Sequence, residues 1–497
     1  MTKGRNAVTV TAAGRGSAGL KILFCISEVQ PFARSGGLSE IGSSLPKSIK
    51  TVSPNTDIRV ILPLYKTVST EVRQKFEFLG SIEIEIAKRL EYCGIYEYKE
   101  NNVTYYFVDN EMYFRRDALY DYSDDYERFA FFSRACLDSV KLTGFRPDIL
   151  HANDWHTALA IVYLKTLYKD KKEYSKIKAL FTIHSLEIQG WAQYSFMTDV
   201  LGLDYRYKSI LEYDGQINFV KAAIVCADWI NTVSPTYAHE VKTTALANGL
   251  GSCIRENAHK FTGILNGIDY ECYNPETNRE LFANYDTKSL EGKAANKREV
   301  QKLLQLPIDS SIPLVLFNGR LTDQKGFNLI TEVINQILSE RIQMIILGGY
   351  GEGRYASFFD YIENKYHGKF KALCYSRSML KKLNAAADLM LMPSLFEPCG
   401  LSQMIASRYG AVPIVRETGG LRDTIRDFGC EGGGNGYTFS QYNASDMLYS
   451  IHRGVTDFVN DGPSWDNKVR ICMEQDFNWT SMVGEYLALY KKLKSSK

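Results

Sequence analysis

The sequence predicts an α/β protein built from two doubly wound domains, each with a parallel sheet between layers of helices. Its 497 residues suit two large domains and exclude a single small one. Short apolar runs alternate with longer helical patterns, and this alternation is typical of a parallel sheet. The runs are too continuously apolar for strands that expose one face to water. No repeat of 20–50 residues is visible, which excludes solenoids and propellers.

The expected strands fall into two sets along the chain. In the first half they are Lys21–Ile26, Ile58–Pro63, Asp148–His151, Leu180–His184 and Trp229–Val233. In the second half they are Thr262–Leu265, Pro313–Asn318, Met344–Leu347, Lys371–Tyr375, Leu389–Pro393 and Val412–Val415. A glycine-containing segment, Ala247–Ser252, separates the two sets. We therefore place the boundary near residue 256, which gives domains of residues 21–256 and 257–476.

The composition excludes several classes of protein. There are 59 Lys and Arg against 57 Asp and Glu, so the net charge of +2 predicts no broadly basic nucleic-acid surface. No apolar run approaches the roughly 18 residues that a membrane span needs. The 10 cysteines are scattered without a C-x-x-C pair, which indicates neither a disulfide framework nor a zinc site.

Residues 1–20 are rich in Gly, Ala, Ser and Thr, with three basic residues and no acidic ones. They lack an apolar core, so we expect no secretory signal peptide. A disordered leader fits this composition better than the remnant of an organellar transit peptide. The expected compartment is the bacterial cytoplasm, with a plastid as the alternative.

Glycine, polar and charged clusters follow the expected strands at their carboxyl ends. These clusters are Ser27-Glu28, Arg34–Leu38, His151–His156, Asn318–Arg320, Phe396–Gly400 and Thr418–Leu421. Ligands of open α/β sheets bind in the crevice at these strand ends. Two such sheets facing each other therefore predict a ligand cleft between the domains.

Two glycine pairs in these clusters are candidate phosphate sites. Gly36-Gly37 and Gly419-Gly420 each stand between a strand and a helix, where free backbone N–H groups and a positive helix end favour an anion. A plain tight turn is the alternative interpretation of either pair. The run Gly348–Gly353 looks like a dinucleotide fingerprint but lacks the acidic residue that this motif needs, so we do not infer NAD.

Charged side chains in the clusters suit an anionic or sugar-like substrate. Arg320 and Lys325 follow a strand and could present two cations to one anion, with a solvated pair as the alternative. Glu397 ends another strand, where it suits sugar hydroxyls or charge that develops in a transition state. Its alternative is an exposed loop acid.

Histidines end two strands of the first half. His151 and His156 are five residues apart, which is wrong for two metal ligands on one helical face, so no metal is expected there. Asp154 and Trp155 between them suggest a carbohydrate contact. His184 ends its own strand, with a buried core histidine as the alternative.

A set of motifs stands in collinear order from about residue 21 to 493. In the first half they are Lys21-Ile22-Leu23-Phe24-x-x-Ser27-Glu28-x-x-Pro31-Phe32, Gly36-Gly37-Leu38, His151-Ala152-Asn153-Asp154-Trp155-His156-Thr157 and Thr232-Val233-Ser234-Pro235-Thr236-Tyr237. In the second half they are Ile264-Leu265-Asn266-Gly267-Ile268-Asp269, Arg320-Leu321-Thr322-Asp323-Gln324-Lys325-Gly326, Phe396-Glu397-Pro398-Cys399-Gly400-Leu401 and Thr418-Gly419-Gly420-Leu421. This set closely resembles the bacterial glycogen synthases and plant starch synthases.

The resemblance implies the GT-B fold, in which two Rossmann-like domains close over a nucleotide sugar. It also implies retaining transfer of glucose from ADP-glucose to the non-reducing end of an α-1,4-glucan, with no metal and no bound cofactor. Two alternatives stay open at this point. One is the same transfer from UDP-glucose, and the other is a weakly active or inactive glucan-binding paralogue that assists another synthase.

By the family's pattern, Arg320 and Lys325 would bind the diphosphate and stabilise charge on the departing ADP. His184, Asp154 and Glu397 would bracket the transferred glucose. These five residues are the expected catalytic set.

The family's pattern implies further contacts around them. Tyr375 would stack on adenine, and Cys399 would be a neighbour in the site rather than a nucleophile. The other nucleotide-sugar contacts would be Arg34, Gly36, Gly37, Gly400, Leu401, Thr418, Gly419 and Gly420. The other sugar and acceptor contacts would be Glu28, Trp155, His156 and Ser185.

The last segment, residues 477–497, resembles the family's final helix, which crosses back to the N-terminal domain. Closure around the ligand is expected because each domain carries half the site. Three residues depart from the family's usual pattern: Arg34 replaces Lys, Ser185 replaces Asn and Glu40 replaces Asp. These departures bear on rate and donor preference more than on fold.

Overall fold

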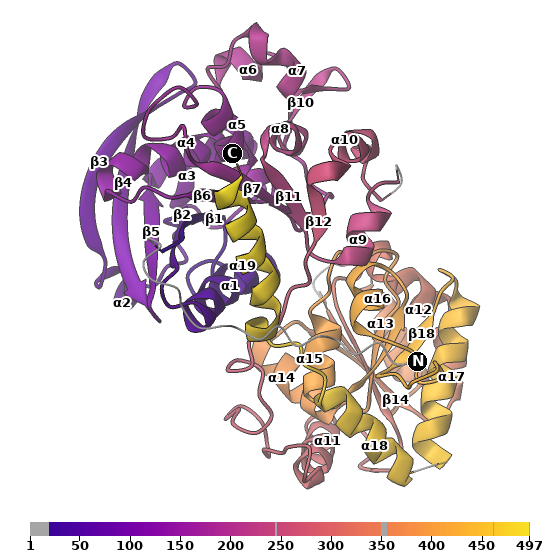
Figure 1. The fold of residues 1–497 in the computed structure, drawn as a ribbon. Helices are drawn as coiled ribbons and strands as arrows, with labels where there is room; N and C mark the ends of the chain where they lie inside the picture. The colour runs from indigo at the N-terminus through magenta and orange to yellow at the C-terminus, as the bar shows by residue number, and fades with distance from the viewer. Residues whose placement is uncertain (1–18, 244–245, 349–354, 461, 497) are drawn as a thin grey trace.

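The computed structural model describes residues 19–243, 246–348, 355–460 and 462–496. Within them the chain forms two α/β domains, the first above the second in Figure 1. The expected leader, apart from its last two residues, and most of the run Gly348–Gly353 lie outside the described residues. No helix in the described part of the chain is long and apolar enough to cross a bilayer.

A nine-stranded sheet forms the centre of the first domain. Its strands are β1 (Lys21–Cys25), β2 (Asp57–Pro63), β3 (Glu77–Ile86), β4 (Arg89–Glu100), β5 (Val103–Asp109), β6 (Ile149–Asn153), β7 (Lys178–Ile183), β11 (Trp229–Thr232) and β12 (Phe261–Gly263). Their order is β12-β11-β7-β6-β1-β2-β5-β4-β3, parallel as far as β5 and antiparallel beyond it. The sequence missed the β3–β4 hairpin because β3 exposes about every second residue and lacks a continuous apolar run.

Helices cover this sheet on both faces. They are α1 (Leu38–Val52), α2 (Thr70–Arg73), α3 (Glu111–Phe114), α4 (Asp125–Thr143), α5 (Trp155–Lys165), α6 (Phe196–Asp199), α7 (Lys208–Leu211), α8 (Phe219–Cys226), α9 (Pro235–Glu240) and α10 (Gly251–Glu256), with 3₁₀ turns η1 (Tyr205–Tyr207) and η2 (Ala258–Lys260). Helix α5 is buried along all but its last residue, because it lies between the sheet and α4 and α8. A small sheet of β8 (Trp191–Ala192), β9 (Glu212–Tyr213) and β10 (Gln216–Asn218) completes the domain.

The second domain has a six-stranded, wholly parallel sheet. Its strands are β13 (Leu314–Asn318), β14 (Gln343–Gly348), β15 (Phe370–Cys374), β16 (Leu389–Met392), β17 (Val412–Arg416) and β18 (Tyr437–Phe439), in the order β15-β14-β13-β16-β17-β18. Its helices are α11 (Glu291–Leu303), α12 (Phe327–Ser339), α13 (Ala356–Lys365), α14 (Arg377–Ala386), α15 (Ser402–Arg408), α16 (Gly419–Thr424), α17 (Ala444–Asn460) and α18 (Gly462–Met473), with the 3₁₀ turn η3 (Asp323–Lys325). The predicted class of two doubly wound α/β domains is confirmed.

The boundary between the domains lies later than the sequence predicted. The strand expected at Thr262–Leu265 to open the second sheet is instead β12, which pairs with β11 through Ile230↔Phe261 and closes the first sheet. The glycine-containing segment Ala247–Ser252 leads into α10 and connects elements within one domain. The chain therefore leaves the first sheet after Gly263, a short way beyond the boundary that the sequence predicted near residue 256.

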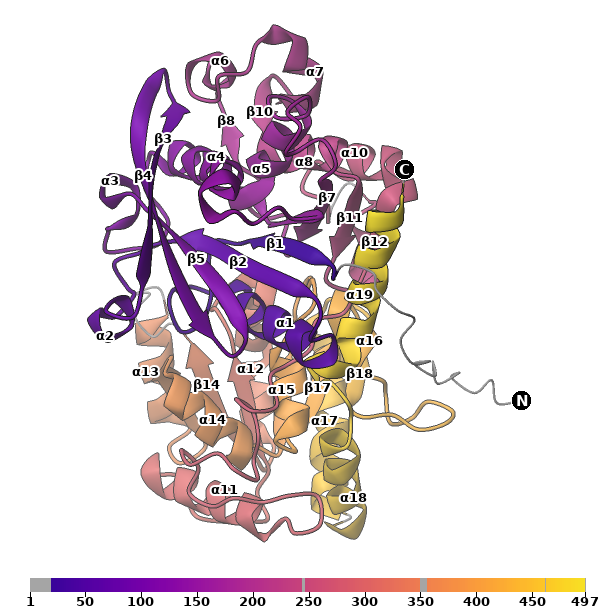
Figure 2. The same ribbon diagram turned by 60° about the vertical axis from the view of Figure 1, so that its left-hand side comes forward.

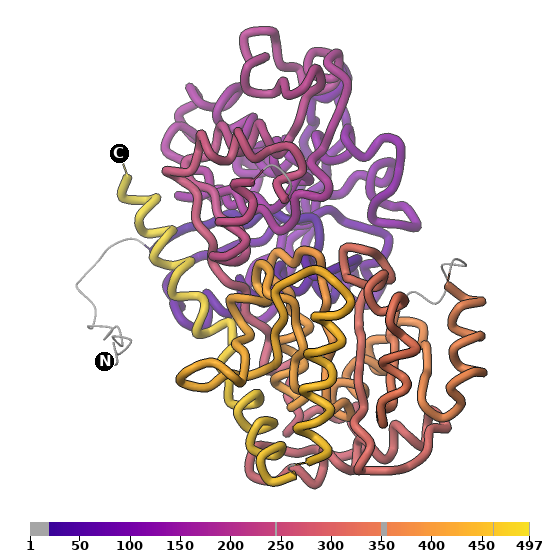
Figure 3. The backbone as a smooth tube through the Cα atoms, turned by 90° about the vertical axis from the view of Figure 1, so that its right-hand side faces the viewer, coloured from indigo at the N-terminus to yellow at the C-terminus, as the bar shows by residue number. Residues whose placement is uncertain are grey.

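The chain crosses between the domains twice, and the two crossings lie side by side. The outgoing segment donates the Ile268 N–H to the Phe477 carbonyl of the returning segment at 2.8 Å. Beyond it, α19 (Trp479–Ser495) packs on α1 of the first domain, as the C-terminal segment in yellow shows (Figures 2 and 3). A buried hydrogen bond of 2.7 Å joins Tyr490 Oη to His151 Nδ1, so α19 is part of the first domain's structure.

Candidate active site

The strand order of each sheet reverses beside its central strand. In the first sheet β1 lies between β2 and β6, and in the second β13 lies between β14 and β16. Ligands of doubly wound sheets bind at such reversals, beyond the carboxyl ends of the strands. A cavity of about 760 Å³ occupies this place and is lined by residues of both domains. The predicted interdomain cleft is confirmed.

Most of the predicted site residues line this cavity. From the first domain they are Glu28, Arg34, Gly36, Gly37, Asp154, His156, His184 and Ser185. From the second domain they are Arg320, Lys325, Tyr375, Glu397, Cys399, Gly400 and Leu401. Segments more than 350 residues apart therefore form one site, since Glu28 and Leu401 both line it.

Asp154 is held in an unusual backbone conformation where β6 meets α5. Its φ of 56° is one that residues other than glycine rarely adopt, and such strain is typical of functional sites. One carboxylate oxygen accepts main-chain N–H groups of His184 at 2.7 Å and Ser185 at 3.4 Å. Burial nevertheless raises the pKa of Asp154 to about 7, against the two hydrogen bonds that lower it. This carboxyl can therefore accept or donate a proton near neutral pH.

His184 is a neutral imidazole with one nitrogen open to a ligand. Burial lowers its pKa to about 3. Asn153 donates its amide N–H to the Cys25 carbonyl, so its amide oxygen accepts from His184 Nε2 at 3.0 Å. Nε2 therefore carries the proton, and the buried Nδ1 has no hydrogen-bond partner among the described residues. Nδ1 can accept a hydrogen bond from a hydroxyl group in the cavity.

Glu28 organises the loop between β1 and α1. Its carboxylate accepts hydrogen bonds from the Ser35 N–H at 2.5 Å, the Ser35 hydroxyl at 2.7 Å and the Gly36 N–H at 3.2 Å. The Tyr120 hydroxyl donates to the same carboxylate at 2.7 Å. Glu28 lines the cavity, but most of its hydrogen-bonding capacity holds the loop that carries Gly36-Gly37.

The second domain contributes charged groups. Lys325 Nζ lies 2.6 Å from a Glu397 carboxylate oxygen, and the Ser394 hydroxyl donates to the same oxygen at 3.2 Å. Arg320 is held more loosely. Its guanidinium lies 2.7 Å from the side-chain oxygen of Gln324 and 3.4 Å from a carboxylate oxygen of Glu187 in the first domain. The Arg320 side chain is 64% exposed. Both cations lie where an anion entering the cleft would meet them.

Tyr375 and Arg34 meet across the cleft from different domains. The Arg34 guanidinium donates to the Tyr375 hydroxyl at 3.0 Å and lies 3.6 Å from a Glu40 carboxylate oxygen. Glu40 also accepts a hydrogen bond from the Tyr273 hydroxyl at 2.7 Å. Tyr375 keeps 49% of its surface exposed, so its ring is free to receive a flat partner.

Cys399 is buried beside Glu397. Burial raises the pKa of the Cys399 thiol to about 12, so the group stays a neutral thiol at neutral pH. Because a neutral thiol is a poor nucleophile, this protonation state favours the predicted role of Cys399 as a neighbour in the site.

Trp155 does not line the cleft. It was expected to contact sugar, but only 5% of it is exposed and it packs edge-on against Phe129 in the core of the first domain. Its neighbour His156 does line the cleft, and burial lowers the pKa of His156 to about 3. The sequence could not show that the first turn of α5 directs the indole inward and the imidazole toward the cleft.

Thr418, Gly419 and Gly420 were expected to hold phosphate, and they do not line the cleft either. The Gly420 N–H donates to the Glu397 carbonyl at 3.1 Å, and the Gly419 N–H donates to Glu240 of the first domain at 3.1 Å. The backbone groups that would have held an anion are therefore already bonded within the protein, and the phosphate assignment of this motif is corrected.

Several cleft residues were not assigned a role from sequence. Asn266 and Asn318 line the cavity, and their buried amide oxygens have no partner among the described residues. Tyr273 and Glu187 also line it. Asn318 is the last residue of β13, so its place at a strand's carboxyl end was an available signal. Tyr273 and Glu187 lie in irregular segments that gave none.

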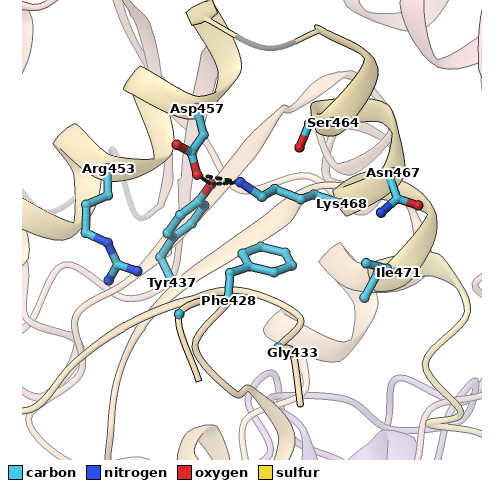
Figure 4. Close-up of a pocket in the computed structure, with 11 residues that line it drawn as sticks. Phe428, Gly433, Tyr437, Arg453, Asp457, Ser464, Asn467, Lys468 and Ile471 are labelled. Atoms are coloured by element: carbon cyan, nitrogen blue, oxygen red, sulfur yellow. Dashed lines mark hydrogen bonds and ion pairs between the residues drawn. The ribbon is translucent and has the colours of Figure 1, made fainter. Parts of the chain in front are cut away.

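A second cavity, of about 510 Å³, lies in the second domain between α17, α18 and the loop after Phe428 (Figure 4). Its cations are already paired, Arg453 with Asp427 at 2.7 Å and Lys468 with Asp457. Lys468 also lies 5.2 Å from the centre of the Phe428 ring. Because these contacts use the charged groups of the cavity, we assign it no ligand.

Comparisons with known proteins agree with this geometry. Residues 21–256 match the family model of the starch synthase catalytic domain, and residues 301–464 match that of glycosyl transferases group 1. The chain is 41% identical to a glycogen synthase of Bacillus cereus (strain B4264), over 95% of this chain and 100% of that protein. It is 42% identical to a glycogen synthase of Clostridium novyi (strain NT), over 95% and 99%. The chain belongs to the glycogen and starch synthase family.

Solved structures agree with this membership. The catalytic domain of Starch Synthase IV from Arabidopsis thaliana, bound to ADP and acarbose, superposes with a TM-score of 0.89 at 33% identity, covering 96% of this chain and 100% of that one. A sucrose-phosphate synthase from Thermosynechococcus elongatus, at 16% identity and a TM-score of 0.60, shares the fold alone. The protein is therefore a glycosyltransferase of the GT-B fold with glycogen or starch synthase function, which acts on a nucleotide-sugar donor and a glucan acceptor.

Proposed function

We propose that this family member transfers glucose from ADP-glucose to the non-reducing end of an α-1,4-glucan and keeps the α configuration. One observation carries the proposal. The Lys325–Glu397 pair of the second domain lines the same cavity as Asp154 and His184 of the first, so an anion site adjoins a hydroxyl site. A sugar joined to a diphosphate carries both an anionic group and hydroxyl groups, and would fill both sites.

On the donor side, Lys325 and Arg320 would take the diphosphate. Lys325 exchanges one Glu397 oxygen for a phosphate oxygen, and the exposed Arg320 guanidinium turns from Glu187 toward the ligand. As the bond to the sugar breaks, negative charge develops on the departing diphosphate, and two fixed cations stabilise it. The proposal gives these side chains the task that a metal ion performs in other transferases, and it needs no cofactor.

On the sugar side, the groups would position hydroxyls and the anomeric carbon. His184 Nδ1 and the amide oxygens of Asn266 and Asn318 are acceptors without partners among the described residues, which suits the many donors of glucose. Glu397 is an anion that can balance positive charge on an oxocarbenium-like transition state. Precise positioning of this kind contributes a large part of a transferase's rate.

For the nucleotide base, Tyr375 offers an exposed ring beside Arg34. Adenine is the base that we propose, and the ADP bound to the Arabidopsis Starch Synthase IV domain supports it. Stacking accepts any base, so the donor has to be tested directly.

The test measures incorporation of labelled glucose into glycogen from ADP-glucose and, separately, from UDP-glucose, with Lys325→Ala as the control. We expect incorporation from ADP-glucose that is lost in the control, and a product that an enzyme specific for α-1,4 bonds digests fully. Equal or faster incorporation from UDP-glucose would overturn the donor assignment. A product that resists digestion would overturn retention.

A further inference from the structure

Two motifs of the sequence meet each other outside the cleft. Helix α9 of the first domain begins at Pro235, in the Thr232–Tyr237 motif, and α16 of the second begins at Gly419, in the Thr418–Leu421 motif. The Thr236 N–H and hydroxyl donate to the Asp423 carboxylate at 2.9 and 2.6 Å. In return, Glu240 accepts the Gly419 N–H at 3.1 Å and the hydroxyl of the residue before it at 3.2 Å.

The contact is reciprocal. Glu240 ends α9 and caps the beginning of α16, while Asp423 lies near the end of α16 and caps the beginning of α9. The two helices must therefore run antiparallel. Each carboxylate satisfies N–H groups that a helix leaves unpaired at its start, and each lies at the positive end of the other helix. We call this pair of helices the α9–α16 joint.

The joint touches the loop that carries Glu397. The Gly420 N–H donates to the Glu397 carbonyl at 3.1 Å. A Cβ at Gly419 would lie 1.9 Å from the Glu397 carbonyl oxygen, and a Cβ at Gly420 would lie 2.0 Å from that of Cys399. These glycines are therefore required for close packing, and the position of Glu397 is tied to α16 and through it to the first domain.

Other contacts between the domains are built differently. Arg34–Tyr375 at 3.0 Å and Arg320–Glu187 at 3.4 Å join side chains that line the cavity, in the space where the nucleotide would enter. The joint uses main-chain N–H groups, hydroxyls and carboxylates. Its five bonding residues lie outside the cavity lining, and they are Thr236, Glu240, Thr418, Gly419 and Asp423. A ligand entering the cavity would meet the first kind of contact and not the second.

We propose that the α9–α16 joint is the pivot on which the domains close, and that Glu240 and Asp423 are positioning residues that hold Glu397 opposite Asp154 and His184. The joint stays formed in open and closed states, while Arg34–Tyr375 and Arg320–Glu187 break and re-form. Removing either carboxylate frees the pivot, so the two halves of the site meet less often in the reactive arrangement.

The rate part of this inference rests on the proposed transfer from ADP-glucose. Glu240→Ala and Asp423→Ala are each expected to lower kcat by about tenfold or more. The affinity for ADP, measured by calorimetry, should stay within about twofold, because the cations proposed to bind it belong to the second domain and are unchanged. A residue with a structural role alone would lower the yield or thermal midpoint and leave kcat per folded enzyme unchanged.

Milder variants keep the test valid if an alanine variant does not fold. Thr236→Ser retains the hydroxyl that donates to the Asp423 carboxylate and should keep full kcat, whereas Thr236→Val loses this donor and should lose a part of kcat. The matched control is Glu271→Ala, which removes the exposed ion pair between Glu271 and Lys47, also formed between the domains. Its kcat should stay within about twofold of wild type.

Small-angle scattering tests the pivot without turnover. With ADP bound, the wild type should show one smaller radius of gyration, while Glu240→Ala should show a larger value or a mixture. The inference is overturned if both alanine variants keep kcat and the wild-type scattering change. If the wild-type protein closes on ADP but transfers no glucose, the proposed function is wrong and the pivot remains supported.

Discussion

The two walls of the cleft differ in how far they are prepared before a ligand arrives. On the first-domain wall, Asp154 accepts two main-chain N–H groups and His184 has one tautomer fixed by Asn153. On the second-domain wall, Arg320 is 64% exposed and its partners are other flexible side chains. The wall proposed to hold the sugar is thus preorganised, whereas the wall proposed to hold the diphosphate would be completed by the ligand. Substitutions on the two walls should therefore affect different measured quantities.

The largest effect is expected at Lys325, where the ligand completes the wall. Lys325→Ala should lower kcat by about 10²–10³-fold, because it removes the charge that we propose stabilises the departing diphosphate. Steady-state kinetics with ADP-glucose and glycogen measure it. Lys371→Ala, which removes a lysine ion-paired with Glu363 away from the cleft, is the matched control and should stay near wild type. Full activity in Lys325→Ala would remove this residue from the mechanism.

Buried groups of the preorganised wall should make the free energy of unfolding depend on pH. The folded-state pKa of His156 is about 3, far below its unfolded value, so between pH 6.5 and 4.5 the unfolded chain takes up a proton that the folded chain does not. The free energy of unfolding therefore falls as pH falls, by as much as about 2.7 kcal/mol for this group over two pH units. Urea unfolding of His156→Gln should show a flatter pH dependence.

Asp154 works in the opposite direction. Its folded-state pKa of about 7 is raised, so between pH 4 and 7 the folded chain holds a proton that the unfolded chain has lost, and stability from this group falls as pH rises. Asp154→Asn should therefore make the loss of folding stability at low pH steeper, whereas His156→Gln should make it shallower. Parallel slopes in both variants would contradict the pKa assignments on this wall.

A smaller effect is expected at Tyr375, on the open wall. Tyr375→Ala should raise KM for ADP-glucose by about tenfold, since stacking on a base contributes on the order of 1–3 kcal/mol. The kcat should change little, and Tyr375→Phe should retain a KM close to wild type because the ring remains. If the alanine variant kept the wild-type KM, adenine would lie elsewhere.

The smallest effect is expected where the chain departs from the family pattern. Arg34→Lys and Ser185→Asn should each change kcat/KM by less than about threefold, because charge or hydrogen bonding is kept at both positions. The same transfer assay measures it. A gain of more than about tenfold in either variant would instead favour a weakly active, glucan-binding paralogue.

The sequence predicted the parts of the site that depend on topology. Glu28, Asp154, His184, Arg320 and Glu397 follow strands of doubly wound sheets, and the strand order brings their positions together. The expected roles of these residues in catalysis stay predictions, because the geometry places groups and does not measure rates.

The sequence could not predict which way a side chain points or which partner a backbone group finds. Trp155 follows Asp154 directly yet faces the core, since the first turn of α5 packs against Phe129. Gly419 begins a helix shortly after a strand, as glycines of a phosphate loop do. Its N–H, however, donates to the carboxylate of Glu240, 179 residues away. Contacts of such long sequence separation leave no local pattern.

The position of α19 has a consequence for biosynthesis. Its apolar side chains complete the same core as β1 and α1, and they are Trp479, Val483, Tyr486, Leu487, Leu489, Tyr490 and Leu493. The first domain emerges from the ribosome first, but this part of its surface stays uncovered until Trp479–Ser495 are made, on the order of tens of seconds later. The nascent protein therefore passes through a stage that needs protection from aggregation, and a chain that stopped before Trp479 would have both sheets but an unfinished first domain.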